Sequence, residues 1–389
     1  MKTALVHDWL TGMRGGEKVL EVLCERFPDA ELFTLLHVRG SVSPAIERRP
    51  IHTSALQHLP GVRHYYRECL PSFPSLIERF DLGRFDLVIS SSHCVAKSVL
   101  TRPGTIHVCY CHTPMRYLWE LYPAYLNQFG RNSITRALMA PVANYLRTWD
   151  YSTAARVDHF VANSWNVRRR IWKTYRRKAK VVYPPVAIES FHHDRSDGYF
   201  LMVAEMVAYK QLDYAIRTFA GNGRRLKIVG DGPEYRALRK LAAPNIEFCG
   251  RVSDEELRVL YARSSALVIP GVEDFGMTMV ESLASGKPVV ALGRGGAVEI
   301  VREKCGVLFE DSTEAGLSEA LRTFDRIEPT FNPLYLRTAA ADFSESVFER
   351  EFGAVLAGML GQRSYAAAPE PEFTTSLQVP HDTRSARPL

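Results

Sequence analysis

The chain has 389 residues, of which 46% are hydrophobic and 24% are charged, a composition typical of a folded globular protein. This length exceeds what one ordinary hydrophobic core accommodates, so two domains are expected. No apolar run approaches the roughly 20 residues needed to span a bilayer, and the first residues show no pattern of a secretory signal. The seven cysteines are scattered without a CxxC spacing, which favours buried thiols in a reducing compartment over disulfides or a zinc site. We therefore expect a cytoplasmic protein.

Positive charge is concentrated in the first half of the chain. Residues 1–185 hold 26 Lys and Arg against 14 Asp and Glu, whereas the remainder holds 23 against 29. The densest basic stretch runs from Arg168 to Lys180, and no acidic residue lies between Asp158 and Glu189. This asymmetry predicts contact with an anionic partner such as a membrane surface or a lipid diphosphate. A solvated helix face explains the stretch equally well, and nucleic acid is disfavoured because no recognisable binding module surrounds it.

Along the chain, short apolar runs that predict buried strands alternate with amphipathic segments that predict helices. The expected strands of the first half are residues 2–6, 86–90, 106–110 and 159–162, with a glycine-bearing loop at 11–16 and a helix at 17–26 after the first strand. Those of the second half are residues 200–204, 226–230, 246–249, 266–270 and 288–292. This alternation predicts an α/β protein with two Rossmann-like parallel sheets, each covered by helices on both faces, that meet at a cleft.

Four regions follow from this pattern. A Pro-Pro pair at residues 184–185 cannot continue a strand or a helix, so it marks the end of a first domain, residues 1–185. The second domain is expected at residues 186–340. A helix at 341–361 is expected to pack back towards the first domain, and the Pro-, Ala-, Ser- and Thr-rich residues 362–389 are expected to form a disordered tail.

The most informative segment runs from Pro270 to Pro288, after a predicted buried strand. It turns at Asp274-Phe275-Gly276 and enters a helix that carries Glu281 about two turns along. The start of that helix offers free backbone N–H groups and a positive dipole end, which suit a phosphate. Glu273 lies at the carboxyl end of the strand, where open α/β sheets bind ligands. One carboxylate can accept sugar hydroxyls and the other a ribose diol, although either glutamate alone would be an ordinary surface acid.

These residues resemble the signature of the retaining glycosyltransferases of family 4, which have the two-domain GT-B fold. In that family two glutamates are separated by seven residues, commonly with Phe-Gly between them, as Glu273 and Glu281 are. The resemblance extends in order over residues 1 to about 310, and it points to the branch that contains bacterial polysaccharide mannosyltransferases. The further matching segments are 7–10, 15–18, 111–119, 161–164, 183–185, 209–210, 229–234 and 250–253.

The resemblance implies roles for particular residues. His112 would touch the donor sugar near its anomeric carbon, and Lys210 would stabilise the charge of the departing diphosphate, so His112, Lys210 and Glu273 are the candidate catalytic residues. Backbone at Gly15 and Gly16 could approach the diphosphate or sugar closely because glycine has no side chain. The other implied donor-binding residues are Arg251 and Val252 for the base, Phe275, Gly276, Met277 and Thr278 for phosphates or hydroxyls, and Glu281 for the ribose. A lone Gly-Gly could be an ordinary turn, and a lone His a core residue.

One position departs from the family pattern. The family usually has an Arg five residues before the Lys, where this chain has Glu205, and Gln211 follows Lys210 where Arg is common. A carboxylate there would repel the diphosphate. Either another base such as Arg14 or Arg294 substitutes, or Glu205 turns towards Lys210, or donor binding is weakened.

The mechanism implied by the resemblance is front-face attack through an oxocarbenium-like state, with no cofactor and no metal, because no Asp-x-Asp pair occurs. The implied donor is GDP-mannose. The implied acceptor is a glycan on a polyprenyl diphosphate in polysaccharide or exopolysaccharide synthesis, at the inner face of the cytoplasmic membrane. Two alternatives stay open, a nucleotide-sugar epimerase and a non-catalytic homologue that binds glycans or partner proteins.

Acceptor contacts are expected in the first domain. The candidates are Asp8, Arg116 and Trp119. Aromatic and basic side chains suit an interfacial patch, here at residues 117–119, Tyr122, Tyr125 and Arg131, although ordinary core packing would explain any one of them equally well.

Overall fold

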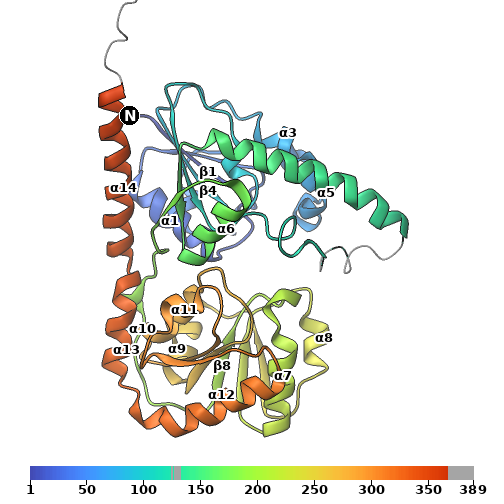
Figure 1. Cartoon of the computed structure of the whole chain (residues 1–389), viewed down its shortest axis with the longest axis vertical. Coiled ribbons are helices and arrows are strands. Elements are labelled where there is room, and N and C mark those ends of the chain that lie inside the picture. Colours follow the sequence, from blue (N-terminus) through green and yellow to red (C-terminus); the bar gives the residue numbers. More distant parts are fainter. Residues whose placement is uncertain (124–125, 127–132, 367–389) are drawn as a thin grey trace, which may run out of the picture. The chain divides into compact units, whose positions relative to one another are not determined.

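The computed structural model describes residues 1–123, 126 and 133–366 of the chain. Residues 1–351 form one compact unit, in which the strands make two separate parallel sheets (Figure 1). The predicted α/β class with two Rossmann-like parallel sheets is confirmed. The predicted contact residues Tyr125 and Arg131 lie outside the described part of the chain.

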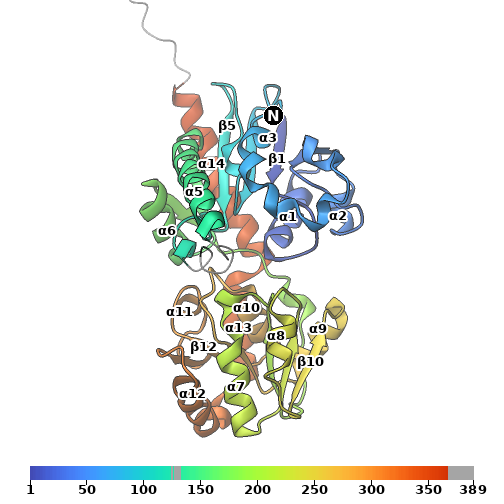
Figure 2. The same cartoon turned by 90° about the vertical axis from the view of Figure 1, so that its right-hand side faces the viewer.

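The first sheet has seven strands in the order β3-β2-β1-β4-β5-β6-β7. Their bounds are β1 Thr3–His7, β2 Glu31–Thr34, β3 Ile51–Thr53, β4 Leu87–Ser92, β5 Ile106–Cys111, β6 His159–Ala162 and β7 Ala179–Val181. Helix α1 (Gly15–Arg26) lies on one side of this sheet, and α5 (Ser133–Thr153) and α6 (Trp165–Tyr175) lie on the other (Figure 2). Two short helices, α2 (Pro44–Glu47) and α3 (Phe73–Ile77), complete the named α-helices of this half.

The second sheet has six strands in the order β10-β9-β8-β11-β12-β13. Its strands are β8 Phe200–Val203, β9 Leu226–Val229, β10 Ile246–Gly250, β11 Ala266–Ile269, β12 Val289–Leu292 and β13 Gly306–Phe309. The helices of this half are α7 Leu212–Asn222, α8 Tyr235–Arg239, α9 Asp254–Arg263, α10 Met277–Ala284, α11 Ala297–Ile300, α12 Glu314–Ile327 and α13 Pro333–Ala340.

Every expected strand is present, with its ends shifted by at most two residues. The strands that the sequence did not reveal are β2, β3, β7 and β13, which have only three or four residues each. Each of them pairs with the strand beside it in its sheet, β1, β2, β6 or β12, and this pairing is set by the tertiary structure.

Both sheets reverse the direction of strand order at a defined point. From β1 the chain continues to β2 and β3 on one side, and it then crosses to β4 on the other side of β1. The second sheet does the same between β8 and β11. Because helices leave such a point on opposite faces, ligands bind in the crevice at the carboxyl ends of the two strands. The fold therefore provides two places for a site, after β1 and β4 and after β8 and β11.

The end of the chain differs from the expectation. A 3-10 turn at Ala341–Phe343 precedes α14, which spans Glu345–Ala366 and passes from the first unit into a second unit that begins at Phe352. The helix continues past residue 361, so the segment expected to be a tail begins in helical residues, and its part from residue 367 lies outside the described residues. The packing of this helix against the first domain stays a prediction. No helix in the described part of the chain is long and apolar enough to cross a bilayer.

Candidate active site

The switch point of the second sheet brings together the predicted cation and the first predicted glutamate. Lys210 ends a 3-10 turn (Ala208–Lys210) that follows β8, and Glu273 follows β11. The ammonium of Lys210 contacts both carboxylate oxygens of Glu273. Both residues also line a small pocket, together with residues 202–204, 212 and 268–271. The two side chains thus lie where parallel sheets bind ligands.

Lys210 stays protonated in this setting. Burial lowers the pKa of its ammonium, but the carboxylate of Glu273 and other nearby groups together outweigh burial, so the net pKa is raised. The cation is therefore available to an anionic ligand, and such a ligand has to compete with Glu273.

The loop from Glu273 to α10 is fixed by glycines. Gly276 precedes α10 with φ of 104°, and a Cβ at this position would lie 2.1 Å from Cε of Met279. The N–H of Gly296 donates to the carbonyl of Glu273 at 2.9 Å, and a Cβ on Gly296 would lie 1.9 Å from the Phe275 carbonyl oxygen. Only glycine fits such contacts. The pattern of the sequence did not reveal the role of the Gly295-Gly296 pair, although adjacent glycines after a buried strand are a signal of this kind.

The predicted donor-binding residues at the start of α10 are placed for backbone contacts. The ring of Phe275 is buried against Tyr183 and Phe343, with ring centroids 5.5 Å from each, so its side chain is used for packing. Met277 and Thr278 begin the helix, whose first N–H groups lie at the positive end of the helix dipole.

Glu281 lies on α10 and is buried, with 3% of its surface exposed. Its carboxylate accepts hydrogen bonds from Tyr261 Oη at 2.8 Å and from Lys18 Nζ at 2.9 Å. Lys18 belongs to α1, which covers the first sheet, and Glu281 belongs to α10 beside the second sheet. This ion pair therefore joins the two halves of the chain. The sequence predicted a ribose contact for Glu281, and in this structure the carboxylate binds these two side chains.

The predicted glycines and histidine of the first domain also come together. Gly15 and Gly16 are the first residues of α1. A Cβ on Gly16 would lie 3.6 Å from His112 Nε2, and a Cβ on Gly15 would lie 3.3 Å from Met277 Sδ. The Gly-Gly pair therefore lies between His112 on one side and the start of α10 on the other.

His112 is held by a chain of polar contacts that the sequence did not reveal. Its Nε2 lies 2.8 Å from Ser91 Oγ, which in turn lies 3.1 Å from Nδ1 of His7. Glu17 Oε1 lies 3.6 Å from the other nitrogen of His7. Ser91 is the next-to-last residue of β4 and His7 is the last residue of β1, so these contacts lie at the carboxyl ends of the two strands that form the switch point of the first sheet.

His112 is neutral at physiological pH. Burial is the main cause that lowers its pKa to about 3, and the neighbouring His7 and His93 lower it further. A neutral imidazole can accept or donate a hydrogen bond with the nitrogen that faces away from Ser91.

Asp8 was predicted on the acceptor side, and the structure places its carboxylate inside the first domain. Its side chain is completely buried, and its carboxylate accepts four backbone N–H groups, those of residues 93–96, at 2.7–2.9 Å. The ring of His93 adds a contact at 3.0 Å. Burial opposes ionisation of Asp8, but His93 and the other partners outweigh it and lower the pKa of this carboxyl. Asp8 therefore shapes the loop after β4.

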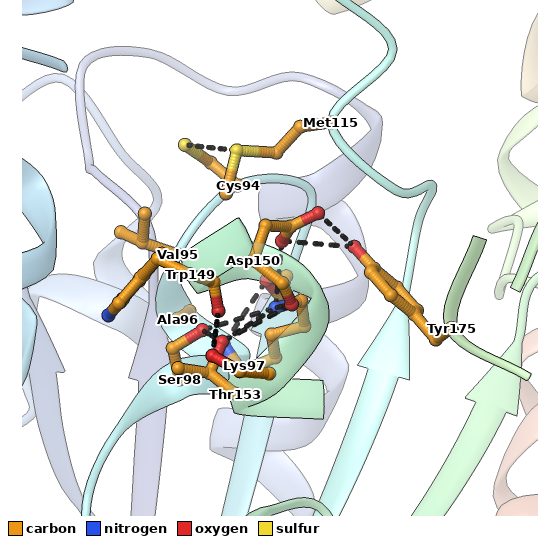
Figure 3. A network of polar contacts seen from close by, with 12 residues as sticks. Cys94, Val95, Ala96, Lys97, Ser98, Met115, Trp149, Asp150, Thr153 and Tyr175 are labelled. Atoms are coloured by element: carbon orange, nitrogen blue, oxygen red, sulfur yellow. Dashed lines mark hydrogen bonds and ion pairs between the residues drawn. The ribbon is translucent and has the colours of Figure 1, made fainter. Parts of the chain in front are cut away.

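Trp119 is also part of the internal structure. Its indole N–H donates to Asp150 Oδ2 at 2.8 Å, and Asp150 forms a buried ion pair with Lys97 at 2.8 Å. Tyr175 of α6 donates to the same carboxylate (Figure 3). Leu118 is buried, and Tyr117 and Tyr122 pack against the same core. These aromatic residues are partly buried against the core of the first domain, and the expected interfacial patch stays a prediction. The network around Asp150 joins α5 to α6.

Arg116 lies beside the donor motif. Its guanidinium contacts Asp274 at 3.2 Å and Glu120 at 2.6 Å, and it stacks on the ring of Tyr209 with its carbon 4.8 Å from the ring centroid. Arg170 of α6 contacts the same two carboxylates. Arg116 was predicted on the acceptor side, and the structure places it against the residues that flank Lys210 and Glu273.

Glu205 turns away from Lys210. Its Oε1 lies 3.8 Å from Arg14 and 3.6 Å from Arg67, both in the first half of the chain. Arg294, the other base considered, donates to the carbonyl of Glu310. Glu205 therefore lies close to two cations. One of them, Arg14, directly precedes Gly15 and so lies next to the Gly-Gly pair.

Arg251 and Val252 follow β10 at the edge of the second sheet. Arg251 is mostly exposed, and its Nε lies 3.8 Å from Asp231. The carbonyl of Gly250 accepts the N–H of Gly230, which positions this loop next to the end of β9. Their predicted contact with a base stays a prediction.

Comparison with known proteins agrees with this arrangement. Residues 13–190 match the model of Glycosyltransferase Family 4, and residues 186–331 match that of Glycosyl transferases group 1. Both models describe glycosyltransferases, and together their matches span residues 13–331.

Individual relatives are more distant. The D-rhamnosyltransferase WbpZ of Pseudomonas aeruginosa is 27% identical over 51% of this chain and 56% of its own length. A GDP-mannose-dependent alpha-(1-6)-phosphatidylinositol monomannoside mannosyltransferase of Mycobacterium tuberculosis is 32% identical over 26% of this chain and 30% of its own. The chain spans about half the length of the first curated relatives it matches.

Solved structures share the fold. HepE of Anabaena in complex with UDP superimposes with a TM-score of 0.67 over 92% of this chain and 100% of its own, at 15% identity. The fold is therefore GT-B, as predicted.

Proposed function

We propose that this protein transfers a sugar from a nucleotide-sugar donor to an acceptor hydroxyl, with retention of configuration and without a metal ion. The observation that carries the proposal is the Lys210–Glu273 pair at the switch point of the second sheet, next to the start of α10. An ammonium and free helix amides suit a diphosphate, and a neighbouring carboxylate suits sugar hydroxyls.

In the proposed reaction, Lys210 and the amides of Met277 and Thr278 stabilise the diphosphate as the bond between the anomeric carbon and the phosphate oxygen breaks. The acceptor oxygen attacks the same face of the sugar, and its proton passes to the departing phosphate oxygen. Glu273 holds sugar hydroxyls, and His112 and the backbone of Gly16 limit how the sugar lies. Glu281 would bind the ribose by exchanging its contact with Lys18.

We further propose GDP-mannose as donor and a glycan on a polyprenyl diphosphate as acceptor, at the membrane face. Support for mannose comes from the mannosyltransferase relatives, and the UDP complex of the structural neighbour keeps a uridine nucleotide in the test. Support for a lipid-linked acceptor comes from the basic first half of the chain.

The test has two parts. Calorimetric titration with GDP and UDP should show binding of one nucleotide well below millimolar, and binding of neither would favour the non-catalytic alternative. Mass spectrometry and NMR of the products from GDP-mannose and a lipid-linked glycan should show one added hexose with the donor's anomeric configuration. A changed nucleotide sugar formed without acceptor would identify an epimerase instead.

A further inference from the structure

We propose that the exposed face of α6 is the surface by which this protein binds an anionic lipid bilayer. The inference deepens the membrane contact in the proposed function and identifies where it occurs. It rests on two tryptophans, Trp165 and Trp172, which are 50% and 51% exposed on one helix. The side chain of Trp165 also contacts Tyr183 and lies under the guanidinium of Arg168, and about half of each tryptophan still faces water. Two half-exposed tryptophans on one helix face are the apolar part of the proposed surface.

The two tryptophans belong to the same face of an amphipathic helix. Residues seven apart lie one above the other after about two turns, so Trp165 and Trp172 point in the same direction. The opposite face carries Val167, Ile171 and Tyr175, which are buried in the core with β5 and β6. The inner face of the helix packs against the core through these three residues, and the two tryptophans are not part of that packing.

Positive charge surrounds the two rings. The exposed residues on and directly after the helix include Arg168, Arg169, Lys173, Arg176, Lys178 and Lys180. The guanidinium of Arg168 lies over the ring of Trp165, 4.6 Å from its centroid. Among the described ion pairs, none involves these six basic residues, whereas Arg170 pairs with Asp274 and Glu120. The six charges are therefore available to an external anion.

This combination fits a bilayer surface. Tryptophan prefers the membrane–water interface because its ring is apolar and its N–H is polar. Lys and Arg side chains next to it attract anionic headgroups while their stems cover apolar surface. A nucleic acid would also attract the charges, and the test below separates the two.

The helix is rigid and reaches the donor motif. Ser164 caps its start by accepting the N–H of Val167 at 3.0 Å, and Ser164 Oγ also donates to the carbonyl of Asp274 at 2.7 Å. Tyr175 at its end is tied to the buried Asp150 (Figure 3). A bilayer bound to the outer face of α6 would therefore lie next to an element that contacts the residue after Glu273. A lipid-borne acceptor would then be held close to the donor.

The experiment measures flotation of the full chain with vesicles of pure phosphatidylcholine and with an equal mixture of phosphatidylcholine and phosphatidylglycerol. The protein should bind the mixed vesicles at least tenfold more tightly, and high salt should weaken binding. Trp172→Ala should weaken binding about tenfold because apolar area is removed from the interface. Arg169→Gln with Lys173→Gln should weaken it by about thirtyfold, since each charge near the surface contributes roughly a factor of five.

Matched controls lie on other helices. Tyr335→Ala removes a 45% exposed aromatic ring on α13, and Arg322→Gln with Arg326→Gln removes two exposed charges on α12. These controls should bind vesicles like the unmodified chain, and circular dichroism should show every variant folded. Equal vesicle binding by the α6 variants and the controls would overturn the proposal.

Two further outcomes are informative. Tighter binding to a single-stranded oligonucleotide than to the mixed vesicles, lost in the α6 variants, would overturn the proposal in favour of nucleic acid. Nucleotide titration separates the two proposals, and the Arg169→Gln, Lys173→Gln variant should retain nucleotide binding. If the unmodified chain binds nucleotide but no vesicles, only the α6 surface is rejected. If it binds vesicles but no nucleotide, only the donor site is rejected.

Discussion

Replacing Glu273 by Gln should separate nucleotide binding from sugar transfer. In the structure, the ammonium of Lys210 is bound by the carboxylate of Glu273, and both side chains are largely buried, at 17% and 14% exposure. A hydrogen bond to a charged group contributes about 1.5–3 kcal/mol, and a diphosphate has to displace this one. Glutamine keeps an acceptor but loses the charge, so the competition is relieved by about 1 kcal/mol, which corresponds to about fivefold tighter nucleotide binding.

Transfer should respond in the opposite direction. The amide is a weaker acceptor for sugar hydroxyls than the carboxylate, and it no longer offsets positive charge on the reacting sugar, so kcat should fall by about a hundredfold or more. The assay combines calorimetry with GDP or UDP and steady-state kinetics with the sugar nucleotide. Glu319→Gln on the exposed surface of α12 is a matched control. The reasoning is refuted if Glu273→Gln weakens nucleotide binding severalfold while the protein stays folded, because Glu273 would then support the nucleotide.

Three other changes test the site and its support. His107 is buried with its pKa lowered to about 4, mainly by burial, so stability is lost as pH falls below the unfolded value of 6.5. Urea unfolding should show a loss of stability between pH 6.5 and pH 5 that is about 1.5 kcal/mol smaller in His107→Gln, where the buried His112 still contributes a loss of its own, and an equal loss in that variant would contradict the assignment. Lys18→Ala leaves the buried Glu281 with one partner and should lower the unfolding free energy by about 1–2 kcal/mol in thermal or urea melts, whereas no change would show that the pair contributes nothing. Ser91→Ala removes the contact that orients His112 and should lower kcat about tenfold with nucleotide affinity unchanged, so a change confined to affinity would argue against a positioning role.

The order of strand, turn and helix around the predicted donor motif could be read from the sequence, because that motif is local. Glu273 follows β11, Gly276 lies in the turn and Glu281 lies on α10, as their spacing indicates. The sequence did not reveal the internal partners of Asp8 and Trp119. A polar or aromatic residue at a strand end can face a ligand or the interior, and the local pattern is the same in both cases.

Local sequence by itself determined the alternation of strands and helices, the two parallel sheets and the turns at Gly15-Gly16 and Gly276. The tertiary structure alone decided which charges meet. Lys18 reaches Glu281 across 263 residues, Lys210 binds Glu273 across 63, and Glu205 turns to Arg14 and Arg67 in the other half of the chain. Periodicity reports the environment of each residue along its own element, whereas ion pairs between distant segments depend on the path of the chain and on how the elements pack.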